Sequence, residues 1–460
     1  MAPDGVSARI PAGVAAGHPA TVTAGIEILE EGGTAADAAV AACLASCVAE
    51  TVMTGLLGGG HAIYFDGEEA WNLDCFVDVP SGDGAEPVEL HVPFGEELVH
   101  YAVGPGTCAV PGLPHGLGEL HGRYGRLPWP RLVEPALRLA REGVTMPAAH
   151  AACLVMLGPV FTMQPDGDRI YAPAGGLLET GEKLEQPGLA TALELLAVEG
   201  AASVYAGSIG ELLTAVEGVP VTADDLTRYE ARWEPPAEVA WLGRRVLTRA
   251  GLSGVPDTLE RLPRLRDLDS SARVHALLRA LAEGETDGHT TNLVTADAAG
   301  AACVLTSSLG LGTGDFLPGL DVQLNSMLGE VDLIRAPLRP GERMGSMMAP
   351  TLVFDDGVEL AIGSAGGTRL RTALVGVAAG ILDEELDPVD AVGQPRFHRA
   401  GDVVNAEPGV DERALEELTQ TGLYVRRWPA LHHYFGGVSL IGRTGAAGDP
   451  RRSGDAATLT

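Results

Sequence analysis

The apolar residues near the start of the chain recur at the spacing of α-helices. Three of them lie three to four positions apart: Val22, Ile26 and Leu29. Gly32 marks the end of this first helical pattern. Thr34 and Asp37 then have the spacing of a capping box, so we expect a second helix that runs to about Val48. Because this second segment is apolar on nearly all sides, the helix is expected to be buried.

Paired runs of β-branched and apolar residues predict hairpins at three places. The residues between the paired runs include Gly or Asp-Gly, which favour tight connections between strands. The pairs are residues 62–65 with 70–73, 293–297 with 301–306, and 351–354 with 358–362.

Helical patterns fill much of the remaining chain, and they lie at residues 132–142, 189–199, 209–216, 271–283 and 369–382. Helix-rich flanks around several hairpins fit a layered α+β sandwich, in which two sheets lie between two helical layers. Residues 1–12 resemble a loose leader. Residues 234–288 form a passage rich in Pro and Arg with one helix, and we expect it to hold the loop that leads to residue 289.

The chain is strongly acidic: its 460 residues carry a formal net charge of −31, from 31 basic and 62 acidic side chains. A surface of this sign repels nucleic-acid backbones and anionic lipids, so we expect no nucleic-acid and no membrane partner. No apolar run reaches the roughly 18 residues of a membrane span. The N-terminus lacks the pattern of a secretory signal, so a cytoplasmic location is expected.

The cysteines and histidines do not indicate a metal site. The six cysteines have no CxxC spacing and fit buried, reduced thiols. Four histidines stand near other motifs but lack the spacing of metal ligands, namely His18, His61, His289 and His398. We therefore expect no metal and no cofactor.

Thr290 is the candidate nucleophile. It stands in the stretch His289-Thr290-Thr291-Asn292, directly before the strand pair at 293–306. An internal threonine hydroxyl has no base of its own, whereas cleavage after His289 would free an α-amine on Thr290. The unperturbed pKa of such an amine is about 7.7–8.0, so nucleophile and base would belong to one residue. Two threonines at a strand start are otherwise ordinary β-branched sequence, so the surroundings decide between the two interpretations.

Short motifs rich in Gly and Pro follow one another along nearly the whole chain. In the first half they are residues 17–20 (GHPA), 32–40 (GGTAADAAV), 55–60 (GLLGGG), 110–112 (VPG), 124–129 (YGRLPW) and 186–190 (QPGLA). In the second half they are residues 312–314 (GTG), 348–351 (MAPT), 363–368 (GSAGGT), 395–398 (PRFH), 435–438 (FGGV) and 449–452 (DPRR). In kind and order they resemble the motifs of the γ-glutamyltransferase family of N-terminal-nucleophile hydrolases.

This resemblance implies a four-layer αββα sandwich and a self-processing enzyme that acts on a small molecule. Cleavage between His289 and Thr290 would give a helix-rich large part, residues 1–289, and a strand-rich small part, residues 290–460. The two fragments would stay together as a heterodimer and form one intertwined catalytic unit.

The resemblance also implies roles for three residues near Thr290. Ser308 matches a threonine that hydrogen-bonds to the nucleophile in the family, and serine keeps the hydroxyl group. Gly366 and Gly367 match the paired glycines of the oxyanion hole. They stand between a predicted strand and a predicted helix, where main-chain N–H groups and the helix N-terminus can stabilise an oxyanion.

The positions that would bind the substrate depart from the family pattern. Phe76 stands where the family has an arginine that holds the substrate α-carboxylate, and a phenyl ring cannot replace a guanidinium group. Gly329 stands in place of the acid that binds the α-amino group, and Gly310 in place of an asparagine. Ser346 is retained from a serine pair that contacts the carboxylate, but its neighbour is Met347. Since charge-assisted bonds contribute roughly 1.5–3 kcal/mol each, we expect altered specificity.

Three hypotheses about function follow. The leading one is a cytoplasmic, self-processing amide hydrolase or acyltransferase with non-standard γ-glutamyl specificity. The first alternative keeps the same nucleophile but hydrolyses a C–C bond beside a carbonyl, as some family members in natural-product pathways do. The second is an uncleaved, non-catalytic homologue. The joint presence of Thr290, Ser308 and the glycine pair argues against it.

Overall fold

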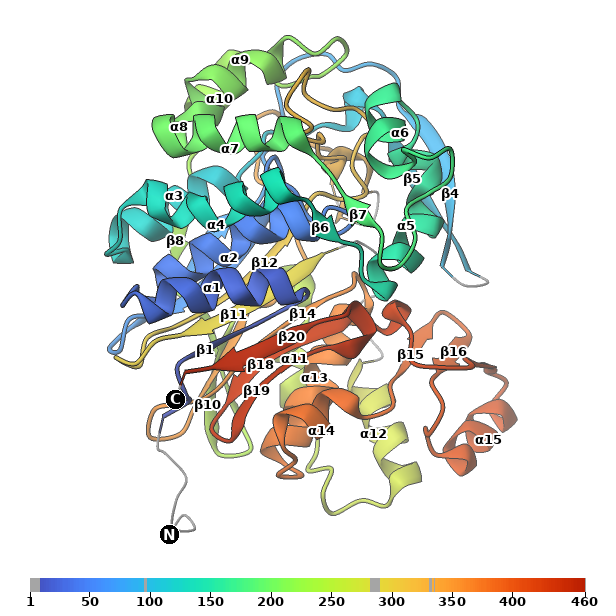
Figure 1. The fold of residues 1–460 in the computed structure, drawn as a ribbon. Coiled ribbons are helices and arrows are strands. Elements are labelled where there is room, and N and C mark those ends of the chain that lie inside the picture. The colour runs from blue at the N-terminus through green and yellow to red at the C-terminus, as the bar shows by residue number, and fades with distance from the viewer. Residues whose placement is uncertain (1–8, 95–96, 282–289, 331–332, 335, 460) are drawn as a thin grey trace.

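Two stacked antiparallel sheets form the centre of the molecule (Figure 1). The computed structural model describes residues 9–94, 97–281, 290–330, 333–334 and 336–459. In spatial order the seven-stranded sheet contains β20 (Asp455–Thr458), β1 (Gly13–Ala16), β11 (Thr291–Ala296), β12 (Ala302–Ser308), β2 (Gly59–Phe65), β3 (Ala70–Cys75) and β8 (Arg232–Glu234). The six-stranded sheet contains β19 (Gly445–Gly448), β18 (Gly437–Gly442), β14 (Val358–Ala365), β13 (Thr351–Phe354), β10 (Arg244–Thr248) and β9 (Ala237–Trp241). In the seven-stranded sheet, strands that precede Thr290 are therefore interspersed with strands that follow it, whereas the six-stranded sheet has β9 and β10 together at one end.

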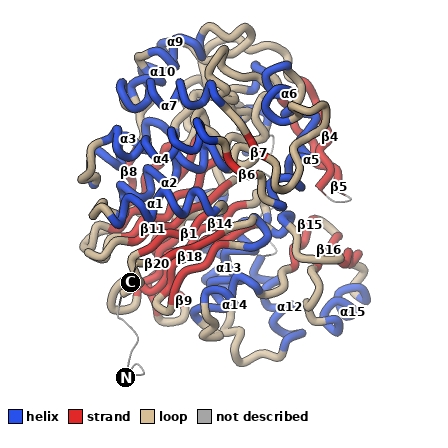
Figure 2. The backbone as a smooth tube through the Cα atoms, viewed as in Figure 1, coloured by secondary structure: helices blue, strands red, loops and turns tan. Residues whose placement is uncertain are grey.

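A helical layer covers the outer face of each sheet, as the alternation of helix and strand in Figure 2 shows. The helices over the seven-stranded sheet are α1 (Pro19–Glu30), α2 (Ala35–Ala49), α3 (Leu113–Tyr124), α4 (Trp129–Glu142) and α7 (Pro187–Glu199). Those over the six-stranded sheet are α11 (Val255–Arg261), α12 (Ser270–Leu281), α13 (Arg369–Leu382) and α14 (Pro388–Gly393). Burial of apolar surface between the layers is the main driving force for this arrangement.

Each interface between layers has its own apolar core. Side chains of the two sheets meet between them, among them Val294 and Val304 from one sheet and Leu352 and Ile441 from the other. All fifteen residues of α2 are buried, because helices pack around it while one side contacts β11 and β12.

The remaining elements lie at the periphery. They are β4 (Val88–Phe94), β5 (Glu97–Val103), β6 (Val144–Thr145), α5 (Ala148–Phe161), α6 (Pro165–Tyr171), β7 (Lys183–Leu184), α8 (Ala202–Tyr205), α9 (Ser208–Thr214), α10 (Ala223–Arg228), β15 (Phe397–Ala400), β16 (Val403–Ala406), α15 (Glu412–Gln420) and β17 (Tyr424–Arg427). In the described part of the chain, no single helix is long and apolar enough to cross a bilayer; the bent pair Pro187–Glu199 and Ala202–Thr214 reaches that size and apolarity only when taken together.

The three predicted hairpins are confirmed as β2–β3, β11–β12 and β13–β14. The predicted capping box is confirmed too: the Thr34 side chain accepts from the Asp37 N–H, and the Asp37 carboxylate accepts from the Thr34 N–H.

The expectation of a single helix in residues 234–288 was wrong. This passage also contains the hairpin β9–β10 and the helix α11. The hairpin turn consists of Leu242 and Gly243, both with positive φ (52° and 80°), which is the backbone of a two-residue connection between twisted strands. Neither strand alternates cleanly between apolar and polar residues: the apolar Ala240 is exposed between the buried Val239 and Trp241, and β10 ends in three consecutive buried residues.

Candidate active site

Thr290 lies at the start of a central strand and lines two separate cavities. It immediately precedes β11, which pairs with β1 on one side and β12 on the other. Thr290 is buried, with only 5% of its surface exposed to solvent. His289, the other residue of the expected cleavage site, lies outside the described residues.

The first cavity, called the front cavity here, brings together most of the expected site residues. Its lining consists of Phe76, Thr290, Ser308, Met327, Glu330, Leu333, Ser346, Met347, Met348, Gly367 and Leu370. These residues come from strand ends of the seven-stranded sheet, from the turn between β14 and α13, from the first turn of α13 and from the segment between residues 327 and 348. The sequence motifs therefore converge on Thr290 in space.

Ser308 and Gly367 line the front cavity together with Thr290, and Gly366 precedes Gly367 in the turn before α13. Ser308 ends β12, and its Oγ accepts a hydrogen bond from the Gly310 N–H at 3.0 Å. Gly366 and Gly367 connect β14 to α13 with φ of 126° and 61°, a backbone that side-chain-bearing residues adopt with strain. A Cβ on Gly366 would also lie 2.7 Å from the Gly436 Cα, so this turn is closely packed.

Two of the expected substrate-binding positions lie away from the front cavity. A Cβ on Gly329 would collide with the carbonyl oxygen of Ala102, so this glycine packs against β5. Gly310 has φ of 69° and packs behind the cavity, where a Cβ would lie 2.7 Å from the Ser326 Oγ. Among the described residues, the acid that lines the cavity is Glu330, which is 2% exposed.

Glu330 and the apolar residues Met327, Leu333, Met348 and Leu370 were not identified from the sequence. The signal that could have found Glu330 is its position directly after the aligned Gly329. The methionines belong to an apolar cluster with Phe76 and Met347, so one wall of the cavity is hydrophobic.

Arg343 and Arg369 bind partners outside the front cavity. Arg343 donates from Nε to Asp78 at 2.6 Å and from Nη1 to Asp74 at 2.7 Å. Arg369 donates from Nε to the Tyr434 carbonyl at 3.0 Å, and its guanidinium lies over the Tyr434 ring. Neither is among the described residues that line the front cavity.

Phe76 is fixed by a buried polar cluster behind it. Its N–H donates to Asp74 at 3.0 Å, and its ring stacks on His61 at a centroid distance of 5.5 Å. Burial lowers the pKa of His61 to about 3, and the charge of Arg249 acts in the same direction. The imidazole is therefore neutral and serves as a packing partner for the phenyl ring.

The second cavity, called the rear chamber here, shares only Thr290 with the lining of the front cavity. It is lined by Gly17, Glu50, Met53, His150, Thr290, Thr291, Asn292, Ala365, Gly437, Val438, Ser439, Asp449 and Arg452. Glu50 follows α2 and is 1% exposed. Its carboxylate accepts hydrogen bonds from the hydroxyls of Thr21, at 2.7 Å, and Thr291.

Burial raises the pKa of the Glu50 carboxyl group to about 6, although the bonds from Thr291 and Thr21 and the charge of Arg452 act in the opposite direction. The ordinary value is 4.5. This carboxyl group therefore contributes stability that is complete below about pH 4.5 and is lost as the pH rises through about 6.

We expect Glu50→Gln to gain stability over the parent protein as the pH rises from 4 to 8. The relative gain in the free energy of unfolding should reach ~2 kcal/mol, because glutamine has the same shape but cannot ionise. Urea unfolding in a Thr290→Ala background, intended to keep the chain in one piece, measures it. Glu68→Gln, at an exposed position, is the control. If the stability difference between Glu50→Gln and the parent protein were the same at pH 4 and pH 8, the raised pKa of Glu50 would be contradicted.

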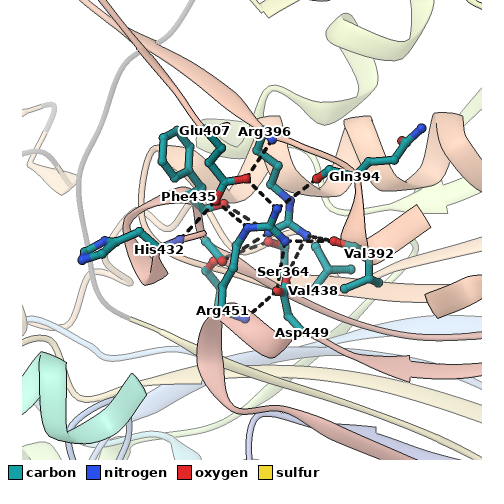
Figure 3. A network of polar contacts seen from close by, with 12 residues as sticks. Ser364, Val392, Gln394, Arg396, Glu407, His432, Phe435, Val438, Asp449 and Arg451 are labelled. Carbon is teal, nitrogen blue, oxygen red and sulfur yellow. Dashed lines mark hydrogen bonds and ion pairs between the residues drawn. The ribbon is translucent and has the colours of Figure 1, made fainter. Parts of the chain in front are cut away.

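A buried ion network supports the segment beside the glycine turn (Figure 3). Arg451 and Glu407 are fully buried and joined by two bonds of 2.7 and 2.5 Å. Asp449 accepts from the Val438 N–H at 3.0 Å and pairs with Arg396 at 2.6 Å. Arg396 in turn donates to the carbonyl oxygens of Phe435 and Gly436. The network thereby fixes Gly436 against Gly366.

Comparison with known proteins identifies the family. The sequence model described as Gamma-glutamyltranspeptidase matches residues 21–278 and 266–459. The chain belongs to the gamma-glutamyltranspeptidase family. Over 494 residues it is 26% identical to the Acylase ACY 1 proenzyme of Pseudomonas sp. (strain SE83), covering 91% of this chain and 87% of the relative. Over 505 residues it is 26% identical to the Capsule biosynthesis protein CapD proenzyme of Bacillus anthracis, covering 96% and 90%.

The solved structures support the same fold. The cephalosporin acylase from Bacillus halodurans superimposes with a TM-score of 0.83 at 22% identity, covering 100% of this chain and 98% of that one. The predicted four-layer αββα architecture is therefore confirmed. Membership places the chain in a family of hydrolases and transferases that includes acylases and glutathione hydrolases.

Proposed function

We propose that this gamma-glutamyltranspeptidase family member is a self-processing amide hydrolase or acyltransferase with Thr290 as its nucleophile. The observation that carries the proposal is the front cavity, where Thr290, Ser308 and Gly367 face an apolar wall that includes Phe76 and Met347. The preferred substrate would be a small-molecule amide with an apolar acyl group.

The reaction would proceed through an acyl-enzyme. The Thr290 Oγ attacks the substrate carbonyl carbon while the α-amine of the same residue takes the hydroxyl proton. The glycine pair at 366–367 and the N-terminus of α13 stabilise the negative oxygen of the tetrahedral intermediate. The amine then passes the proton to the leaving nitrogen as the C–N bond breaks. Water or an acceptor amine finally releases the acyl group.

The apolar wall sets the expected preference. Burial of apolar surface contributes about 25 cal/mol per Å², which favours aromatic or aliphatic acyl groups. A γ-glutamyl group would bring a carboxylate and an ammonium group that lose water on binding. The described lining has no arginine to receive the carboxylate, since Arg343 and Arg369 bind partners elsewhere.

We expect the protein to hydrolyse phenylacetyl-4-nitroanilide at least about 100-fold faster than γ-glutamyl-4-nitroanilide, measured as kcat/KM. Two missing charge-assisted bonds of roughly 1.5–3 kcal/mol each account for a ratio of this size. Phe76→Arg should lower the phenylacetyl rate without restoring γ-glutamyl hydrolysis, because the new guanidinium would lie near Arg343 and Arg249.

The matched control is Phe76→Leu, which keeps the wall apolar and should retain most of the phenylacetyl activity. A wild-type protein that ignores apolar acyl groups, together with a Phe76→Arg variant that gains full γ-glutamyl activity, would refute this account of the cavity.

A further inference from the structure

The rear chamber contains buried polar atoms that lack a protein partner. Among the described residues, His150 Nε2, Asn292 Nδ2 and Arg452 Nε have no hydrogen-bond partner. His150 and Asn292 are 1% and 2% exposed, so bulk water does not solvate these side chains. Buried polar groups of this kind are normally satisfied by an internal water molecule with two to four polar partners.

The size of the chamber fits one such molecule. The space that the centre of a water molecule can reach inside it is about 10 Å³, close to what a single internal water needs. Arg452 Nε can donate to this water, and the carboxylate of Glu50 can accept from it. The lining thus offers both a donor and an acceptor for a water molecule.

Glu50 is held rigidly on the chamber wall. Thr21 from α1 and Thr291 from β11 each donate to one of its two oxygens. Gly17 leaves room for this arrangement, because a Cβ there would collide with the Glu50 Oε2 and lie 3.1 Å from the Thr291 Oγ1. The carboxylate is therefore fixed beside the residue that follows Thr290.

We propose that the rear chamber binds one water molecule and that Glu50, acting through this water, is the positioning residue of the Thr290 amine. The inference rests on the proposed function, since Thr290 has a free amine only after cleavage. The hydroxyl would then be the nucleophile, the amine its base, and the carboxylate the third group that orients the base.

The negative charge of Glu50 favours the protonated form of the Thr290 amine. When Thr290 attacks, its hydroxyl proton passes to the amine nitrogen, and the electron pair left on Oγ forms the bond to the carbonyl carbon. The amine becomes an ammonium group, which a nearby carboxylate stabilises. Glu50 neither gains nor loses a proton in this step.

The charge of Glu50 on the Thr290 amine is opposed by a nearby cation, because the other titratable groups around Glu50 are neutral or paired. Burial lowers the pKa of His150 to about 3, so the imidazole is neutral. The pKa of the Cys43 thiol is raised by its hydrogen bond with Cys47 and by burial, so this group is neutral as well. Asp449 pairs with Arg396. Among the described residues that line the chamber, Arg452 is therefore the cation whose effect on the amine opposes that of Glu50.

The first test is the pH dependence of the amine itself, which needs no substrate. The cleaved protein is treated with cyanate over a range of pH, and carbamoylation of Thr290 is followed by mass spectrometry of the N-terminal peptide of the small fragment. Glu50→Gln should lower the midpoint of this titration by at least about half a pH unit, because the stabilising charge is lost. Arg452→Gln should raise the midpoint, whereas Glu68→Gln should leave it unchanged.

The second test is a high-resolution crystal structure of the cleaved protein. One ordered water within hydrogen-bond distance of both Glu50 and Thr290 is expected. A chamber closed by side chains, or a water that contacts neither group, would overturn the proposed water site.

The outcomes of the titration separate this inference from the proposed function. An unchanged or higher midpoint in Glu50→Gln overturns the role of Glu50. If Glu50→Gln does not cleave itself, the Arg452→Gln variant provides the test. An unchanged or lower midpoint in Arg452→Gln then overturns the role of Glu50. A wild-type chain with no free amine at Thr290 would refute the proposed function, and the inference with it.

Discussion

Replacing Thr290 with alanine is expected to leave the chain uncut and to lower amide hydrolysis by at least about 10³-fold, because both the nucleophile and the source of the base are lost. The parent protein should instead separate under denaturing conditions into fragments of 289 and 171 residues, which together make up the 460 residues of the chain. Intact-mass analysis measures the cleavage, and phenylacetyl-4-nitroanilide measures the activity.

Thr290→Ser is the matched control, since serine keeps a hydroxyl group and should still permit cleavage. A single species of 47.5 kDa with full activity would contradict the proposed self-processing. Full activity in Thr290→Ala would show that another residue is the nucleophile.

The largest expected effect on stability comes from the buried ion network. Glu407→Ala should lower the free energy of unfolding by about 3–5 kcal/mol, because the buried Arg451 guanidinium loses its two short bonds to Glu407 and keeps only the Asp449 carboxylate, at 3.3 Å. The Glu407 and Arg451 side chains are both 0% exposed. Urea unfolding in the Thr290→Ala background measures the change.

An exposed ion pair provides the matched control. Glu412 pairs with Arg427 at 2.7 Å, but the two side chains are 65% and 49% exposed. Water screens such a pair, so Glu412→Ala should change the free energy of unfolding by no more than about 1 kcal/mol. Equal effects of the two substitutions would contradict the importance of the network.

The same network links distant parts of the chain to the glycine turn. Arg451 and Asp449 come from the C-terminal DPRR motif, while Glu407 follows β16. Arg396 completes the connection by donating to the carbonyl of Gly436, which packs against Gly366. The sequence showed these motifs, but it gave no indication that they form one ion cluster.

Local features were the part of the fold that the sequence could predict. The capping box joins Thr34 and Asp37, which are three positions apart, and the β11–β12 hairpin is closed by a short turn that contains Gly300. Such structures depend on nearby backbone and side-chain groups, so their signals lie within a short window. The β9–β10 hairpin was missed although it is local, because neither of its strands alternates cleanly between apolar and polar residues.

The sequence predicted only those residues of the candidate site that lie in motifs shared with the family. Resemblance to the family pointed to Thr290, Ser308 and the glycine pair, and the front cavity brings Thr290, Ser308 and Gly367 together. The resemblance to the family also pointed to Gly329 as a substrate-binding position, but this glycine packs against the Ala102 carbonyl. An alignment gives the order of residues, whereas the direction of each side chain depends on the packing of its neighbours.

The sequence by itself determined the local elements, the acidic charge and the set of motifs, since each depends on residues close together in the chain. The tertiary structure decided which of these groups meet. Glu50 and Thr291 are 241 positions apart, yet stacking α2 on β11 brings their side chains into hydrogen-bond contact. Burial then raises the pKa of Glu50 to about 6. That change arises from the loss of water around the folded carboxylate, and no window of the sequence contains it.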